Sequence, residues 1–124
     1  VVDSAGTGDW HVGEPMDARA QAELSRRGHD ASGHEARQIQ PDWLGNYDLL
    51  LAMDRSNLAR LTALADGRPA LAGRIRLLRA FDPAAADGAE VPDPYYGGPE
   101  EYAEVFDLVD AAVKGLVSHL SDVL

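Results

Sequence analysis

Cysteine is absent from this chain of 124 residues. Without a thiol, these residues form no disulfide and no thiolate metal site, and none of them can serve as a cysteine nucleophile. The four histidines do not have a metal-ligand spacing such as His-Glu-x-x-His. We therefore expect no metal or other cofactor, and the lack of disulfides favours a cytoplasmic protein.

The chain also lacks long apolar runs, and its last third has little positive charge. No stretch has the length of a membrane span or the pattern of a signal peptide. Residues 82–124 carry ten acidic side chains against one lysine, whereas residues 1–81 are close to neutral. Such a segment repels nucleic acid and anionic membranes, so we expect neither as a partner. It is either a solvated helix face or a docking surface for a basic partner.

A glycine-rich loop is predicted at residues 5–13, after a segment at 1–4 that is typical of the end of a strand. The loop does not match G-x-G-x-x-G, and it has no Gly-Lys-Ser or Gly-Lys-Thr, which argues against dinucleotide and Walker-type nucleotide binding. Trp10 lies within it. Two interpretations stay open: Trp10 is the wall of a pocket, or it anchors the loop to the core.

Hydrophobic periodicity predicts alternating strands and helices. Residues 47–53 form a largely apolar run, typical of a strand buried on both faces, and residues 74–79 form a more polar strand. Helices are expected at 14–27, 54–65 and 99–122, with a helical turn at 41–44 that directs Trp43 inward. This order indicates an open parallel α/β sheet. A sheet of three strands is thin, so we expect a further strand beside residues 49–53. The apolar stripe of the last helix comprises Tyr102, Val105, Phe106, Val109, Val113, Leu116 and Leu120.

One carboxylate lies between two prolines in the segment 91–98, which reads Val-Pro-Asp-Pro-Tyr-Tyr-Gly-Gly. The prolines fix their own φ angles and push Asp93 out of the helical region, so Asp93 is expected on a stiff, extended loop. A fixed carboxylate beside Tyr95 and Tyr96 suits a general acid for an aromatic substrate. A proline-rich surface turn is the alternative. Because ligands bind beyond the carboxyl ends of parallel strands, Asp93, both tyrosines and Trp10 could converge there.

Four blocks of the sequence resemble the low-molecular-weight protein tyrosine phosphatases, in the order of that family. They are residues 2–7 with Trp10, then His34-x-Ala36-Arg37-Gln38, then residues 51–58 (Leu-Ala-Met-Asp-Arg-Ser-Asn-Leu), and finally Asp93-Pro94-Tyr95-Tyr96-Gly97. The resemblance implies a single phosphatase domain over residues 1–124, a flavodoxin-like fold with helices on both faces of a four-stranded parallel sheet, and metal-free hydrolysis of phosphotyrosine in proteins or of aryl phosphates.

The resemblance also implies roles for individual residues. Asp93 would be the general acid, and Trp10, Tyr95 and Tyr96 would bind the phenyl ring of the substrate. Ser4 and His34 would brace the phosphate-binding loop by hydrogen bonds, because a loop of inward N–H groups has to be rigid to bind a phosphoryl group.

The chain departs from the family pattern because it lacks the family's nucleophile. This nucleophile lies in an amino-terminal Cys-x-x-x-x-x-Arg-Ser loop, and the chain contains no such loop. We expect that a strand, this loop and a helix are missing from the beginning, roughly 30–40 residues, the size of one βαβ unit. That strand would lie in the middle of the sheet. The expected mechanism passes through a phosphocysteine, so the chain alone would be inactive.

Besides a phosphatase whose beginning is missing from this sequence, two further hypotheses remain. One is a catalytically dead domain that acts as a binding or regulatory module, with a partner chain or a swapped dimer completing its sheet. The other is an enzyme similar to arsenate reductase on the same fold. For the phosphatase, a monomer or a weak homodimer is expected.

Overall fold

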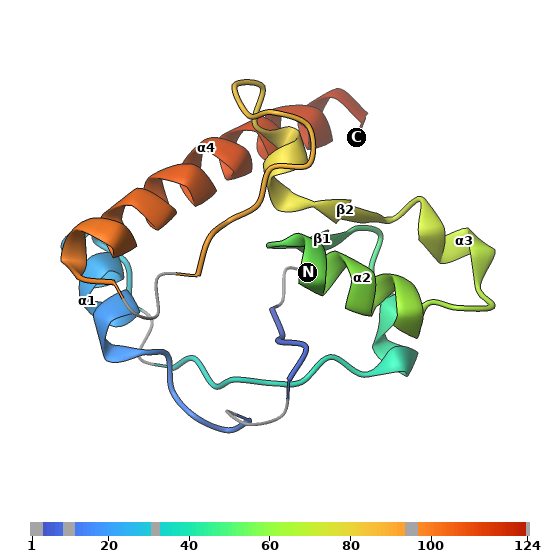
Figure 1. Ribbon diagram of the computed structural model, residues 1–124, viewed down its shortest axis with the longest axis horizontal. Coiled ribbons are helices and arrows are strands. Elements are labelled where there is room, and N and C mark those ends of the chain that lie inside the picture. Colours follow the sequence, from blue (N-terminus) through green and yellow to red (C-terminus); the bar gives the residue numbers. More distant parts are fainter. Residues whose placement is uncertain (1–3, 9–11, 31–32, 94–96, 124) are drawn as a thin grey trace.

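The structure is a computed structural model, and it describes residues 4–8, 12–30, 33–93 and 97–123. Its elements, in chain order, are α1 (Ala18–Arg26), η1 (Pro41–Asn46), β1 (Leu50–Ala52), α2 (Arg55–Leu64), α3 (Pro69–Ala72), β2 (Ile75–Leu77), η2 (Leu78–Phe81) and α4 (Pro99–Val123) (Figure 1). Among the helices in these described ranges, none combines the length and apolar character that a membrane span requires.

β1 and β2 run parallel, in a register that pairs Leu50 with Ile75 and Ala52 with Leu77. They form a two-stranded sheet in the described part of the chain, where a single parallel bridge also joins Gly6 to Gln38. The α/β class with a parallel sheet is confirmed. The strands predicted at 47–53 and 74–79 each pair over only three residues. Of the predicted strand end at 1–4, only Ser4 lies within the described residues, and it is not in a strand.

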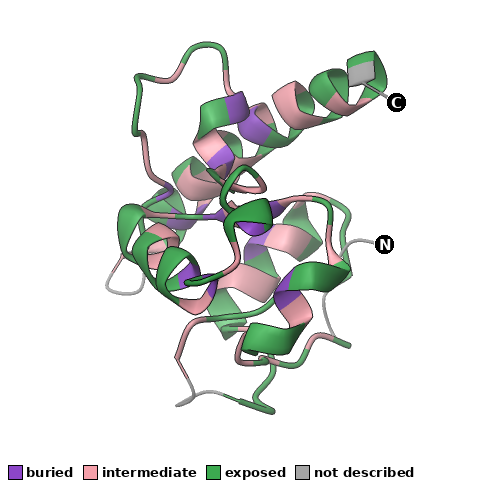
Figure 2. Cartoon of the chain, turned by 90° about the vertical axis from the view of Figure 1, so that its right-hand side faces the viewer, coloured by how far each residue is buried: buried purple, intermediate pink, exposed green. Residues whose placement is uncertain are grey.

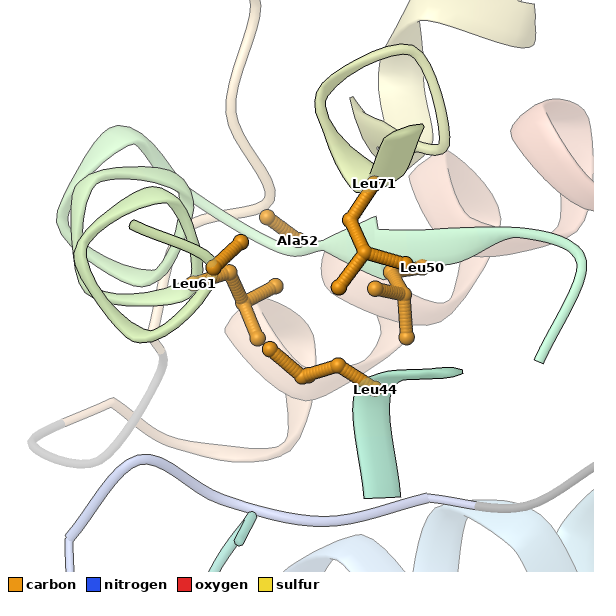
Figure 3. Packing of buried hydrophobic residues seen from close by; sticks show 6 residues of the cluster. Leu44, Leu50, Ala52, Leu61 and Leu71 are labelled. Carbon is orange, nitrogen blue, oxygen red and sulfur yellow. The ribbon is translucent and has the colours of Figure 1, made fainter. Parts of the chain in front are cut away.

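Helices cover both faces of this small sheet, as predicted. Leu50 and Ala52 point into a cluster with Leu44 of η1, Leu61 of α2 and Leu71 of α3 (Figure 3). Leu51, between them, packs on the other face against buried residues that include Ala112 of α4. Because side chains alternate along a strand, the apolar run serves two cores at once. This explains why no polar alternation is visible in the sequence there.

Capping aspartates set the start of two helices. The Asp54 carboxylate accepts a hydrogen bond from the Asn57 amide at 2.7 Å, at the position where a helix start was predicted. The Asp17 side chain caps α1 in the same way, so this helix begins at Ala18 and not at the predicted residue 14. α3 was not predicted, because four residues are too few to establish a helical period.

One prediction about buried side chains was wrong, and another holds only in part. In the turn η1, Leu44 is fully buried, whereas Trp43 is only half-buried and has the Arg37 guanidinium 5.7 Å from its ring. In α4, Val113 is 39% exposed and the neighbouring Ala112 is fully buried. The last turns of α4 extend beyond the buried parts of the molecule (Figure 2). An apolar stripe predicts which residues of a helix share one face, but it does not predict where the elements that cover this face end.

Candidate functional site

A hollow of about 470 Å³ lies where the glycine-rich segment runs beside residues 34–39. The Gly6 amide donates to the Arg37 carbonyl at 2.7 Å, and the Ile39 amide donates to the Gly6 carbonyl at 2.8 Å. Those bonds bring two predicted site residues, Ser4 and His34, to the wall of the same hollow. Its described lining residues are Ser4, Ala5, Gly6, Thr7, Gly8, Val12, His34, Ala36, Arg37 and Asn57.

The polar lining of this hollow suits an anion. Arg37 contributes a positive charge, and its guanidinium donates to the Ser4 carbonyl at 2.9 Å. The side-chain amide of Asn57 donates to the Thr7 hydroxyl at 3.4 Å, which joins α2 to the glycine-rich segment. No Asp or Glu is among the described lining residues. In the part of the chain that the structure describes, no three His, Asp or Glu side chains gather into a set that could ligate a metal ion.

The segment that carries Asp93 follows η2 and passes beside the carboxyl end of β1. The Val91 amide donates to the Met53 carbonyl at 2.7 Å, and Val91 itself is buried. The preceding residue, Glu90, is held twice, because its carbonyl accepts from Arg79 at 2.9 Å and its carboxylate accepts from the Arg55 amide at 2.7 Å. Asp93, two residues after Val91, is exposed. The expected departure of this loop from the carboxyl edge of the sheet is therefore correct.

At the other end of the same segment, Gly97 and Gly98 contact α1 and the start of α4. An Arg19 Nη1 donates to the Gly97 carbonyl at 3.3 Å, and the Gly98 amide donates to the Glu101 carboxylate at 2.9 Å. Arg19 also forms an ion pair with Asp17 at 3.1 Å. Chiefly through hydrogen bonding to the Arg19 side chain, the pKa of Asp17 falls from 3.8 to about 2. Asp17 is therefore ionised at neutral pH.

The predicted site residues divide into three groups. Ser4 and His34 lie together at the hollow, whereas Asp93 is not among its described lining residues. Trp10, Tyr95 and Tyr96 fall outside the described residues, so their convergence with Asp93 stays a prediction.

Sequence reasoning missed three polar residues of this region, namely Arg19, Arg37 and Asn57. Arg37 and Asn57 stood inside the quoted sequence blocks, and their position there was a usable signal. Arg19 is separated from Gly97 by 78 positions, and no spacing rule connects the two.

Comparison with known proteins gives one consistent result. A family model described as low molecular weight phosphotyrosine protein phosphatase matches residues 1–123. A low molecular weight protein-tyrosine-phosphatase of Streptomyces coelicolor is 45% identical over 117 residues, which are 94% of this chain and 70% of that protein. Low molecular weight protein-tyrosine phosphatase A of Mycobacterium tuberculosis is 41% identical over 116 residues, covering 93% of this chain and 68% of that protein.

Solved structures of similar proteins have the same fold. A protein tyrosine phosphatase of Entamoeba histolytica, with Hepes in its active site, superposes with a TM-score of 0.89 at 29% identity, over 98% of this chain and 76% of that one. YfkJ of Bacillus subtilis superposes with a TM-score of 0.81 at 32% identity, over 97% of this chain and 72% of that one.

Proposed function

This chain belongs to the low molecular weight phosphotyrosine protein phosphatase family, and on that premise we propose that Asp93 is the general acid of phosphotyrosine hydrolysis. One observation carries the proposal. The first turn of α2 touches both parts of the candidate site, because the Arg55 amide binds Glu90 of the Asp93 segment and Asn57 lines the anion-suited hollow. An acid and an anion site thus share one rigid support.

The proposed reaction has two steps. A thiolate attacks phosphorus, the bond to the phenol oxygen breaks, and protonated Asp93 gives its proton to the leaving phenolate. Asp93 then takes a proton from the water that cleaves the phosphocysteine, which regenerates the thiolate and releases phosphate. The 124 residues contain no cysteine, so this thiolate has to come from outside them. Lowering of its pKa by a helix N-terminus and an arginine would favour the attack.

The other site residues have supporting roles in this proposal. Ser4 and His34 brace the phosphate-binding loop from the wall of the hollow that they share. Trp10, Tyr95 and Tyr96 contact the phenyl ring of a phosphotyrosine protein or an aryl phosphate. The enzyme acts in the cytoplasm as a monomer or weak homodimer.

The test measures the turnover of two substrates by the Asp93→Asn variant and by the unmodified protein, both expressed as the gene encodes them. Loss of a general acid is expected to reduce kcat about 10²- to 10⁴-fold for phenyl phosphate, whose leaving group needs a proton. The loss should be much smaller for 2,4-dinitrophenyl phosphate, whose leaving group departs as a stable anion. Asp87→Asn, which changes an exposed aspartate of the same long connection, is the matched control. Equal losses for both substrates, or no loss, would show that Asp93 is not the acid.

The intact mass of the same protein separates this proposal from a catalytically dead binding module. A mass above 13.3 kDa, together with turnover that a thiol-alkylating reagent abolishes, supports the phosphatase. A mass of 13.3 kDa without turnover favours the module.

A further inference from the structure

Asp93 lies between two main-chain anchors that belong to different parts of the molecule. The first anchor, at Glu90 and Val91, is made by Met53 just after β1, by α2 and by Arg79. The second is made at Gly97 and Gly98. Asp93 is two residues from Val91 and four residues from Gly97. With so few residues between fixed points, the position of the carboxylate depends on both anchors.

The second anchor includes one side chain from a distant segment. Arg19 donates from Nη1 to the Gly97 carbonyl at 3.3 Å, and its other nitrogens, Nε and Nη2, donate to the Asp17 carboxylate at 3.2 and 3.1 Å. The planar guanidinium is thereby oriented by two bonds while the third reaches the loop, a geometry that lysine cannot reproduce. The contact is to a backbone carbonyl, so it fixes the main chain itself.

Tyr102 completes this assembly from α4. Its ring lies 5.1 Å from the Arg19 guanidinium, its hydroxyl donates to Asp17 at 3.4 Å, and its amide donates to the Gly98 carbonyl at 3.2 Å. Tyr102 is buried. Burial raises the pKa of its hydroxyl, and the negative charges of Asp17 and Asp93 raise it further.

From these contacts we propose that Arg19, held by Asp17 and Tyr102, is a positioning residue that fixes the Asp93 loop at its Gly97 end. The inference rests on the proposed function of Asp93. Its physical basis is that a catalytic group displaced by about 1 Å can lose roughly 10²-fold in rate.

A second arginine also joins α1 to α4. Arg27, at the other end of α1, donates to the Ala103 carbonyl at 3.0 Å and to the Asp107 carboxylate at 2.9 Å. Its guanidinium also lies 5.7 Å from the Phe106 ring. These contacts join the two helices independently. The bond from Arg19 to the Gly97 carbonyl adds a contact to the loop, beside contacts that already join the two helices.

The experiment compares Arg19→Gln and Arg19→Lys with Arg26→Gln, a matched control on the same helix whose side chain pairs with Glu23. Amide hydrogen exchange at Gly97 and Gly98 is measured together with kcat and KM for phenyl phosphate and 2,4-dinitrophenyl phosphate. Both Arg19 variants should exchange faster at these two amides. We expect their kcat for phenyl phosphate to fall about tenfold to hundredfold with KM unchanged, and to fall less for the activated ester. Arg26→Gln should leave exchange and kinetics unaltered.

Unchanged exchange at Gly97 and Gly98 overturns the inference whether or not the enzyme turns over substrate. Faster exchange without the difference between the two esters overturns it as well, because the anchor then has no bearing on Asp93. Failure of the proposed function is distinguishable, since it appears in Asp93→Asn itself, as full activity or as equal losses for both esters, and it removes the basis of this inference. If Arg19→Gln does not fold, Arg19→Lys decides, because it retains the charge beside Asp17.

Discussion

Gly115 of α4 lies directly against the main chain of Phe81 in η2. A β carbon at position 115 would stand 1.8 Å from the Phe81 carbonyl oxygen and 2.8 Å from its carbonyl carbon. Glycine at position 115 lets the last helix come into direct contact with the backbone at the end of η2. The His119 ring of the same helix also lies near Phe81, with 5.3 Å between ring centroids.

Gly115→Ala is therefore expected to destabilise the protein. Helix propensity alone would favour alanine by about 1 kcal/mol. The clash, however, is with backbone and cannot be relieved by a rotamer change, and overpacking of this kind costs about 1–3 kcal/mol or more. Urea denaturation should show a lower free energy of unfolding. Gly73→Ala is the control, since a β carbon there meets nothing within 4 Å; equal stability of the two variants would contradict the close contact.

Stability should depend on pH through Glu23, a buried carboxylate. Hydrogen bonds from Arg26 and Arg27 lower its pKa from 4.5 to about 2, and Arg27 lies 2.6 Å away. A lowered pKa means that this stabilisation is complete above pH 4.5 and is lost as the pH falls toward 2. Glu23→Gln should thus be less stable than the wild type at pH 7, and the difference should shrink between pH 4.5 and 2.

Glu104→Gln, which alters an exposed glutamate on α4, provides the comparison for Glu23→Gln. The denaturation midpoints of both variants can be followed from pH 7 to pH 2. A stability difference for Glu23→Gln that stayed constant over this range would mean that the ion pairs with Arg26 and Arg27 do not stabilise the fold.

Leu44→Ala should be among the most damaging truncations. Leu44 is fully buried between β1, α2 and α3, and loss of a buried leucine costs about 2–5 kcal/mol. Val117→Ala, at a position that is 56% exposed, is expected to cost far less. Thermal unfolding of the two variants measures the contrast. A larger effect at Val117 would indicate that α4 has a partner on that face in solution.

His34→Ala should weaken inhibition of the enzyme by inorganic phosphate. If His34 and Ser4 brace the phosphate-binding loop, removal of one hydrogen bond of about 0.5–1.5 kcal/mol should raise the inhibition constant by up to about tenfold. His29→Ala, at an exposed position just after α1, is the control and should leave the constant unchanged. An unchanged constant in both variants would assign His34 to the scaffold alone.

Local sequence signals predicted much of the framework. The stripe from Tyr102 to Leu120 predicted α4, and Asp54 predicted the start of α2, because periodicity and capping act between residues a few positions apart. The same signals misjudged Val113 and the length of both strands. Burial and strand pairing depend on which neighbour is present, and that neighbour lies far away in the chain.

The sequence by itself determined the family, the helical framework and the candidate residues, since each of these rests on residue types at short, fixed spacings. Only the tertiary structure decided which candidates meet. It brought Ser4 and His34 to one hollow, and it joined Arg19 to Gly97 across 78 positions. The physical reason is that hydrogen bonds and packing act over a few ångströms of space, and no pattern along the chain specifies which distant residues come that close.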